Sequence, residues 1–319
     1  MCSAVVVEEL SKNYGAVRAA REVSFTVETG EIFALLGPNG AGKTTTLEIL
    51  EGFRRRDGGR AEVLGMDPGD RSTERTLRER IGVVLQDIAV EPYLTVRETV
   101  ARNAGYYASP RDVDEVISLV DLAGQRRQKV RTLSGGQKRR LDLALGIVGG
   151  PDLLFLDEPT TGFDPSARRA AWQLVRDLRG AGMTIVLTTH YMEEAQELAD
   201  RVAVMSGGTI VAMGTTASLG GRDAAKVRIS FALPPGCTVA DLPAAAVPAD
   251  VTAGPRAGMV TVETAEPTAT LHQLTGWALD HGWVLAGLTV ERPSLEDVYL
   301  RLTDQADAGA PEHGLGRTI

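Results

Sequence analysis

Residues 37–44, GPNGAGKT, decide how this chain folds, because they fit the pattern G-x-x-x-x-G-K-[ST]. In this pattern a glycine-rich turn between a strand and a helix directs backbone N–H groups at phosphates. The apolar run 32–36 precedes the segment and a helical pattern from 42 to about 51 follows it, so the required context is present and a chance glycine turn is the weaker explanation. The predicted phosphate loop consists of Gly37, Pro38, Asn39, Gly40, Ala41 and Gly42.

Two side chains at the end of this segment would carry its chemistry. The Lys43 ammonium is expected to reach the β- and γ-phosphates, and the Thr44 hydroxyl is expected to ligate Mg²⁺. The helix that begins here adds the positive end of its dipole. The segment therefore predicts a site for ATP with Mg²⁺.

Residues 153–158, LLFLDE, place four apolar residues before two carboxylates. This order is expected of a buried strand whose tip emerges at the ligand edge of a parallel sheet. Asp157 would hold the Mg²⁺ shell, and Glu158 would orient or deprotonate the attacking water. Solvated carboxylates at a strand end are the alternative, and Pro159 and the following TTGFD segment favour the functional interpretation.

Residues 133–137, LSGGQ, form a third segment. Ser134 is a favourable N-cap, so an ordinary helix N-terminus is one interpretation. In either interpretation uncapped N–H groups and a hydroxyl face an anion.

Taken together, these segments resemble the nucleotide-binding subunit of ABC transporters over roughly the first two thirds of the chain. The resemblance implies that Thr45 contacts the α-phosphate and that Asp164 belongs to the D-loop, although Phe163 stands where Leu is usual. It also implies that two chains close over two ATP molecules, so that each site is composite. The residues contacting the γ-phosphate held by the opposite subunit would be Ser134, Gly135, Gly136 and Gln137.

The resemblance assigns three further residues. His190, in TTHYMEEA, matches the switch histidine that contacts the γ-phosphate and steadies the catalytic water, whereas an isolated histidine is more often structural. Gln86 matches the glutamine that senses Mg²⁺ and water and links the core to a helical lobe. Tyr14 matches the aromatic residue that stacks on adenine, and a surface tyrosine in a turn is the alternative. Lys43, Gln86, Glu158 and His190 are therefore the candidate catalytic residues.

The pattern of the chain predicts an α/β fold with two domains. Strands at 4–36, 81–85, 153–157, 184–189 and 201–205, separated by helices, indicate a mainly parallel sheet of the P-loop NTPase type in a domain of residues 1–215. A helical lobe is expected at about 87–150. A small α+β domain is expected at 222–303, with helices at 268–281 and 294–302, and the composition of residues 304–319 predicts a disordered tail.

Composition narrows the function classes. A net charge of −8 argues against a broad surface for nucleic acid, and only Cys2 and Cys237 are present, which favours a reducing cytoplasm. No run of residues reaches the ~18 to 20 apolar residues of a membrane span. A cytoplasmic protein held at the membrane by a partner is therefore expected.

Within the family, three segments narrow the resemblance. TTTLEILEGFRRRDGG, PYLTVRET and PSLEDVYLRLT are similar to the ATP-binding proteins of bacterial drug and antibiotic exporters, of the daunorubicin-resistance type, which work with separate ABC-2-type permeases. This resemblance implies a homodimer of ATPase subunits that energises export. The alternatives are a soluble ABC ATPase acting on nucleic acid or the ribosome and a non-enzymatic nucleotide sensor. Neither is favoured, because basic extensions are lacking and Glu158 and LSGGQ are intact.

Overall fold

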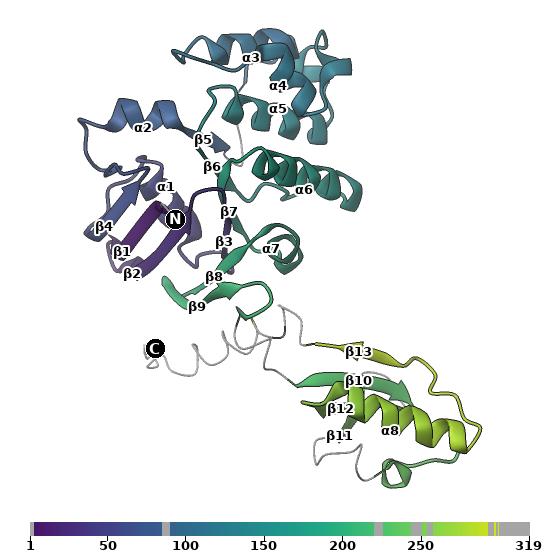
Figure 1. Ribbon diagram of the computed structural model, residues 1–319. Helices are drawn as coiled ribbons and strands as arrows, with labels where there is room; N and C mark the ends of the chain where they lie inside the picture. Colours follow the sequence, from purple (N-terminus) through teal and green to yellow (C-terminus); the bar gives the residue numbers. More distant parts are fainter. Residues whose placement is uncertain are drawn as a thin grey trace, which may run out of the picture. The chain divides into compact units, whose positions relative to one another are not determined.

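The computed structural model describes residues 3–84, 90–219, 226–243, 251–253 and 258–292, together with Asp297 and Tyr299. The chain forms two compact units, which divide between Thr216 and Ala217 (Figure 1). Each unit has a hydrophobic core of its own. Gln86, most of the helix predicted at 294–302, and the predicted tail at 304–319 lie outside the described residues.

The first unit is built on a six-stranded sheet in the order β5-β6-β7-β3-β8-β9. All neighbouring pairs are parallel except β8 with β9. The strands β3, β6 and β7 are buried along their whole length, which explains their nearly continuous apolar sequences. The strand bounds are β3 Ile32–Leu36, β5 Ile81–Val84, β6 Leu153–Asp157, β7 Thr184–Thr189, β8 Arg201–Ser206 and β9 Thr209–Thr215.

A second, antiparallel sheet covers one face of this core. Its order is β2-β1-β4, with β1 Ser3–Tyr14, β2 Val17–Glu28 and β4 Gly58–Val63. The helix α1, Lys43–Leu50, contributes Leu47, Ile49 and Leu50 to the same hydrophobic cluster as the buried residues of both sheets. The helix that follows the phosphate loop is therefore fixed by packing against both sheets.

The remaining helices of this unit flank the sheet or form a lobe. In Figure 1, α3, α4 and α5 gather beyond the β5 edge of the sheet, as predicted for the helical lobe. Capping boxes begin α3 at Thr95 and α5 at Ser134, and Asp164 caps α6 ahead of a proline in the first turn. The bounds are α2 Glu74–Arg80, α3 Val96–Ala104, α4 Val113–Leu119, η1 Ala123–Gln125, η2 Val130–Thr132, α5 Gly135–Ile147, α6 Pro165–Gly180 and α7 Met192–Leu198.

The second unit is a four-stranded antiparallel sheet with one long helix. The strand order is β11-β12-β10-β13, and the alternation of Val227, Ile229 and Phe231 places these side chains on one face. That face packs with Leu274 of the helix α8. The bounds are β10 Val227–Ala232, η4 Val239–Asp241, β11 Val251–Ala253, β12 Met259–Thr264, α8 Pro267–Asp280 and β13 Thr289–Glu291.

The mainly parallel α/β sheet expected from the sequence is confirmed, but several elements were not predicted. These are α2, β4, β9, β11 and β13. The strand β4 begins at Gly58, inside a glycine pair that indicates a turn, and β9 ends in a region rich in glycine and threonine. Among the helices of the described ranges, none combines the length and the apolar character needed to cross a membrane.

Candidate nucleotide site

The phosphate loop joins β3 to α1 and is shaped by backbone that only glycine tolerates. Gly42 has φ of 99°, in the left-handed region, and it is the N-cap of α1. A Cβ atom at this position would lie 2.1 Å from the carbonyl oxygen of Ala19 on β2. The close approach of the loop to β2 therefore depends on the missing side chain.

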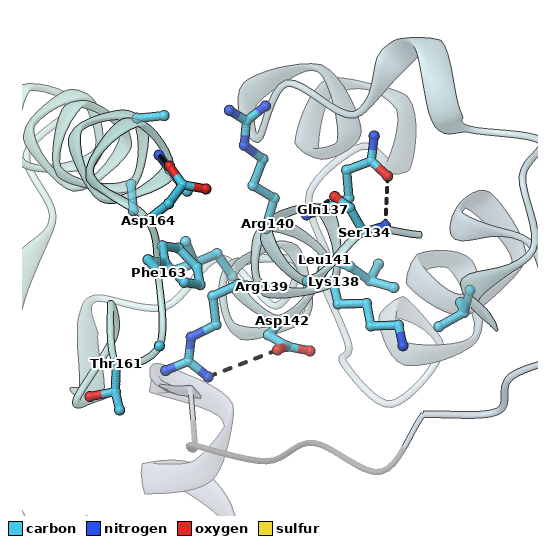
Figure 2. Close-up of a pocket in the computed structure, with 18 of the residues that line it drawn as sticks. Ser134, Gln137, Lys138, Arg139, Arg140, Leu141, Asp142, Thr161, Phe163 and Asp164 are labelled. Carbon is cyan, nitrogen blue, oxygen red and sulfur yellow. Dashed lines mark hydrogen bonds and ion pairs between the residues drawn. The ribbon is translucent and has the colours of Figure 1, made fainter. Parts of the chain in front are cut away.

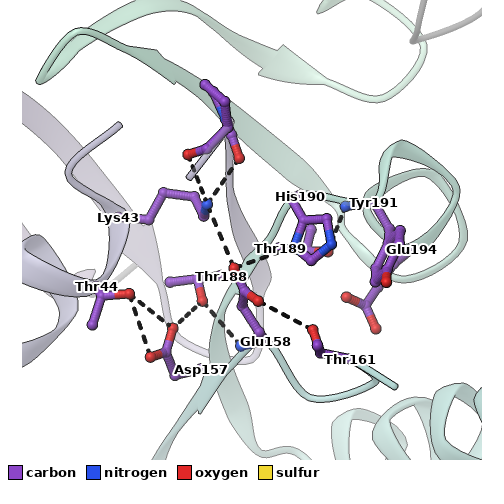
Figure 3. A network of polar contacts seen from close by, with 12 residues as sticks. Lys43, Thr44, Asp157, Glu158, Thr161, Thr188, Thr189, His190, Tyr191 and Glu194 are labelled. Atoms are coloured by element: carbon purple, nitrogen blue, oxygen red, sulfur yellow. Dashed lines mark hydrogen bonds and ion pairs between the residues drawn. The ribbon is translucent and has the colours of Figure 1, made fainter. Parts of the chain in front are cut away.

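Lys43 points back into this loop and is buried. Its Nζ donates to the carbonyl oxygens of Gly37, at 2.8 Å, and Pro38, at 3.1 Å. The same atom lies 3.7 Å from Oε1 of Glu158 (Figure 3). Burial lowers the pKa of Lys43, and the nearby Glu158 and Asp157 carboxylates oppose this shift. The ammonium is thus held inside the loop, at the end of the sheet where the two carboxylates lie.

Asp157 is fixed by a neighbouring strand and by α1. The parallel register pairs Asp157 with Thr188, whose hydroxyl donates to Oδ1 of the carboxylate. Thr44 Oγ1 lies 3.4 Å from each of the two carboxylate oxygens. Burial raises the pKa of Asp157, while hydrogen bonds from Thr188 and Thr44 act in the opposite direction. A carboxylate and a hydroxyl are hard oxygen donors, so this pair fits Mg²⁺.

Glu158, directly after β6, has an unusual backbone conformation. Its φ is +46°, which is uncommon for a residue other than glycine and is found preferentially at functional sites. Its N–H donates to Thr188 Oγ1, at 3.1 Å, and this bond supports the conformation. The same threonine hydroxyl therefore contacts both Asp157 and Glu158.

The Glu158 carboxylate lies close to a threonine hydroxyl, an imidazole nitrogen and the Lys43 ammonium. Thr161 Oγ1 donates to Oε2 at 3.1 Å, and His190 Nδ1 lies 3.2 Å from Oε1. Burial alone would raise the pKa of Glu158, but His190, Thr161 and Lys43 outweigh burial and leave the pKa below its usual value. The carboxylate is therefore ionised at neutral pH and able to accept a proton.

His190 follows β7 at the same edge of the sheet, as the sequence predicts. Its ring packs against that of Tyr191, with 4.0 Å between the centroids. Figure 3 shows the imidazole beside Glu158. The structure therefore brings together five of the predicted residues: Lys43, Thr44, Asp157, Glu158 and His190.

The LSGGQ segment lies at the N-terminus of α5 and lines a cavity of about 1110 Å³. Glu158, residues 161–164 and the start of α6 line the same cavity, and Figure 2 shows Ser134 and Asp164 on its opposite sides. The N-terminus is partly capped, contrary to the expectation of uncapped groups. Ser134 Oγ accepts from the N–H of Gln137 at 3.3 Å, and the Gln137 side chain accepts from the N–H of Ser134 at 2.9 Å.

Two predicted contact residues, Tyr14 and Asp164, have no contact with this network among those described here. Tyr14 ends β1 with 40% of its surface exposed, and its ring is approached by Lys12 Nζ at 5.6 Å and Arg54 Cζ at 5.4 Å. Asp164 Oδ1 caps α6 by accepting from the N–H groups of Ser166, at 2.8 Å, and Ala167, at 2.9 Å. Gln86 lies outside the described residues.

Several side chains that shape the site were not predicted. Thr188 was recognisable once the strands 153–157 and 184–189 were paired in parallel. Arg139 was not, because its contacts with the segment around Glu158 are made to backbone: its guanidinium donates to the carbonyl oxygens of Asp157, at 3.2 Å, and Pro159, at 3.1 Å. Two buried hydrogen-bonding residues, Thr160 and Glu194, also carry no local sequence signal.

A pair of glycine substitutions tests how the loop is built. Gly40 has φ of +82°, but a Cβ there would meet no heavy atom of the described residues within 4 Å. We expect Gly40→Ala to cost about 1 kcal/mol through backbone strain alone. Gly42→Ala should cost more, because the added Cβ also meets Ala19. Urea unfolding of both variants measures the difference, and equal costs would contradict the close approach to β2.

Comparisons in sequence agree with this geometry. The ABC transporter family matches residues 20–161, and a C-terminal domain family of ABC transporter domain-containing protein-like proteins matches residues 227–294. The daunorubicin resistance ATP-binding protein DrrA3 of Streptomyces coeruleorubidus is 36% identical over 94% of this chain and 96% of its own length. The linearmycin resistance ATP-binding protein LnrL of Bacillus subtilis is 34% identical over 93% of this chain and 97% of its own length. A Nod factor export ATP-binding protein I of Rhizobium sp. is 40% identical over 94% and 97%.

Solved structures share the fold of the first unit. The protein cbiO1 of Clostridium perfringens, part of the ABC transporter complex cbiONQ, has a TM-score of 0.63 and 29% identity, covering 67% of this chain and 89% of that one. The ATP-binding cassette MJ0796, in a dimeric state bound to ADP and Pi, has a TM-score of 0.60 and 24% identity, covering 66% and 98%. This chain therefore belongs to the ABC transporter family, as an ATP-binding subunit with ATPase activity.

Proposed function

We propose that this chain binds MgATP at the site around Lys43 and Glu158 and that its ATP hydrolysis powers export through a separate permease. The observation that carries this proposal is the position of Glu158. Its ionised carboxylate lies 3.2 Å from His190 and 3.7 Å from Lys43, beside the oxygen ligands of Thr44 and Asp157. Base, cation and metal ligands thus meet at one edge of the sheet.

The residues divide the work of hydrolysis. Thr44 and Asp157 would hold Mg²⁺, which when bound offsets the negative charge of the phosphates. Lys43 and backbone N–H groups of the phosphate loop bind the phosphate oxygens. Glu158 accepts the proton of the water that attacks the γ-phosphorus, while the bond from that phosphorus to the ADP oxygen breaks. His190 holds Glu158 and the water in place, and Gln86 would sense Mg²⁺.

The cavity at the α5 N-terminus supports a composite site in a homodimer. Ser134 and the two glycines that follow it offer a hydroxyl and backbone N–H groups at a helix N-terminus, a favourable place for an anion. We infer that this surface receives the γ-phosphate bound by the opposite subunit. One chain carries both halves of the site, so two identical chains suffice.

The names of the relatives support the proposed direction and partner. Resistance to daunorubicin or linearmycin and export of Nod factors are properties of those proteins. By this likeness we infer that the present chain energises export of a drug, an antibiotic or another hydrophobic compound. The proposed partner is an ABC-2-type permease that contacts the surface between residues 87 and 107 and holds residues 1–215 at the cytoplasmic face of the membrane. Residues 222–303 are the proposed accessory domain.

Substitutions of Lys43 and Glu158 should have different effects on ATP binding and turnover. Lys43→Ala should weaken both ATP binding and turnover, because a cation at the phosphates is lost. Glu158→Gln keeps the shape of the site without the base, so the rate should fall by about 10² to 10⁴ while ATP still binds. Binding and steady-state ATPase assays separate the two effects. Glu193→Gln, an exposed change on α7, is the matched control, and normal turnover of Glu158→Gln would remove Glu158 from its role.

The composite site predicts dimerisation that depends on ATP. In the Glu158→Gln background, ATP should produce a dimer detectable by light scattering. Adding Ser134→Arg should abolish this dimer, because bulk and charge then occupy the position of the opposite γ-phosphate. Ser118→Arg, on α4 of the same lobe, serves as the control. Normal dimerisation of the Ser134→Arg protein would exclude the LSGGQ segment from the interface.

Recruitment to the membrane should require the permease. Expressed alone, the chain should stay in the soluble fraction, and it should pellet with membranes when the permease gene is co-expressed. Arg97→Glu should reduce this recovery more than Arg75→Glu on α2, because only Arg97 lies in the proposed contact surface. Glu98 is a less suitable test, since its side chain caps α3. Sedimentation with ribosomes or DNA instead would favour the alternative function.

A further inference from the structure

Glu194 is a fully buried acidic residue in the first turn of α7, outside the catalytic site described above. Its Oε1 accepts two hydrogen bonds, from Thr160 Oγ1 at 2.7 Å and from the indole N–H of Trp172 at 3.1 Å. Both donors are themselves buried. Among the described residues, the second carboxylate oxygen, Oε2, has no hydrogen-bond partner. One oxygen therefore joins three separate segments of the chain.

These segments are the ones that carry the catalytic pair. Thr160 lies two residues after Glu158, and Glu194 lies four residues after His190. Trp172 belongs to α6, which begins directly after the 158–164 segment. Figure 3 shows Glu194 next to Tyr191, on the side of His190 away from Lys43. The carboxylate thus ties the segment after the base to the helix after the histidine.

We propose that Glu194 is a positioning residue that sets the distance between Glu158 and His190. The proposal rests on the catalytic roles proposed for these two residues. The direct contact between them is a single approach of 3.2 Å between a side-chain nitrogen and oxygen on different segments. Such a contact keeps its length only if the backbones on both sides are held. The hydrogen bond of 2.7 Å between Thr160 and Glu194 holds the two backbones together, within a few residues of Glu158 and of His190.

A second link supports the same alignment. Arg168, also on α6, lies with its Cζ 4.4 Å from the centre of the Tyr191 ring, and that ring packs on His190. The helix α6 therefore contacts the His190 segment both through Tyr191 and through Trp172 and Glu194. The hydrogen bond from Thr160 to Glu194 differs from these contacts, because it joins α7 to the segment that contains Glu158.

A purely structural role would not require a carboxylate here. Burying a polar group is costly, and apolar replacements of buried polar groups are often neutral or stabilising when all partners are replaced together. One carboxyl oxygen with two lone pairs can, however, accept from two donors at once, so it fixes both donors to the same point. Stability and positioning can therefore be separated by experiment.

The test uses the full chain and three measurements: kcat for ATP, Kd for a non-hydrolysable ATP analogue, and the unfolding midpoint. Glu194→Met removes the acceptor, Thr160→Val removes the hydroxyl, and the triple variant with Trp172→Phe replaces the whole polar group by apolar side chains. Glu194→Gln retains the acceptor. Thr184→Val is the matched control, since it removes a buried threonine hydroxyl at the opposite end of β7.

We expect kcat to fall about 10- to 100-fold in Glu194→Met and in Thr160→Val, with Kd unchanged, because misplacement of reacting groups affects turnover and leaves the phosphate loop intact. In a protein that carries both Glu194→Met and Thr160→Val, the two falls in kcat should not multiply, because both substitutions remove the same hydrogen bond. Glu194→Gln should stay within about threefold of the wild type, since one acceptor remains for both donors. The triple variant should unfold at a midpoint close to the wild-type value and still be slow.

Three results would overturn the proposal. They are a normal kcat in Thr160→Val, a rise in Kd as large as the fall in kcat in the Thr160 and Glu194 variants, and recovery of turnover in the triple variant. A loss in Glu194→Gln as large as that in Glu194→Met would also do so. Failure of the underlying site is distinguishable, because it would appear as normal turnover of Glu158→Gln. If Glu158 is required and the Thr160 and Glu194 variants behave as the control does, only the positioning role is lost.

Discussion

The register of three parallel strands is the constraint on which the rest of the first unit depends. β6 pairs with β7 so that Asp157 lies opposite Thr188, and β3 pairs with β7 so that Leu36 lies opposite Thr189. The chain leaves all three strands at one edge of the sheet, as the phosphate loop, the Glu158 segment and the His190 segment. A shift of one residue in either pairing would turn these side chains to the other face. The polar site is therefore a consequence of the apolar packing beneath it.

The electrostatics of the site follow from this crowding. Two adjacent carboxylates, Asp157 and Glu158, meet one ammonium and one imidazole within a partly buried edge. Thr188 connects the two residues, since its hydroxyl donates to the Asp157 carboxylate and accepts from the backbone N–H of Glu158. Glu158 has a positive φ, and its carboxylate contacts Thr161 and His190. The two neighbours thus acquire different surroundings, one raising and one lowering the pKa.

The sequence could predict the parts of the site that are local in the chain. Lys43, Thr44, Asp157 and Glu158 stand in short segments at fixed spacing, next to apolar runs that identify buried strands. Arg139, Thr160 and Glu194 could not be predicted in this way. Their roles arise from contacts between segments 18 to 34 residues apart, and no periodicity marks them. The strand β4 was missed for a different reason, because its pairing with β1 overrides the turn preference of its glycines.

Arg139 has a consequence for how the two halves of a composite site would communicate. Its guanidinium, on the second turn of α5, holds the backbone carbonyls on both sides of Glu158. Ser134 at the start of that helix is the surface proposed to meet the nucleotide of the other subunit. A rigid helix of 13 residues transmits a displacement of one end to its neighbouring turns with little loss. Binding of a nucleotide at one site would therefore displace the backbone that positions Glu158 in the other site. The two sites would be coupled mechanically through α5.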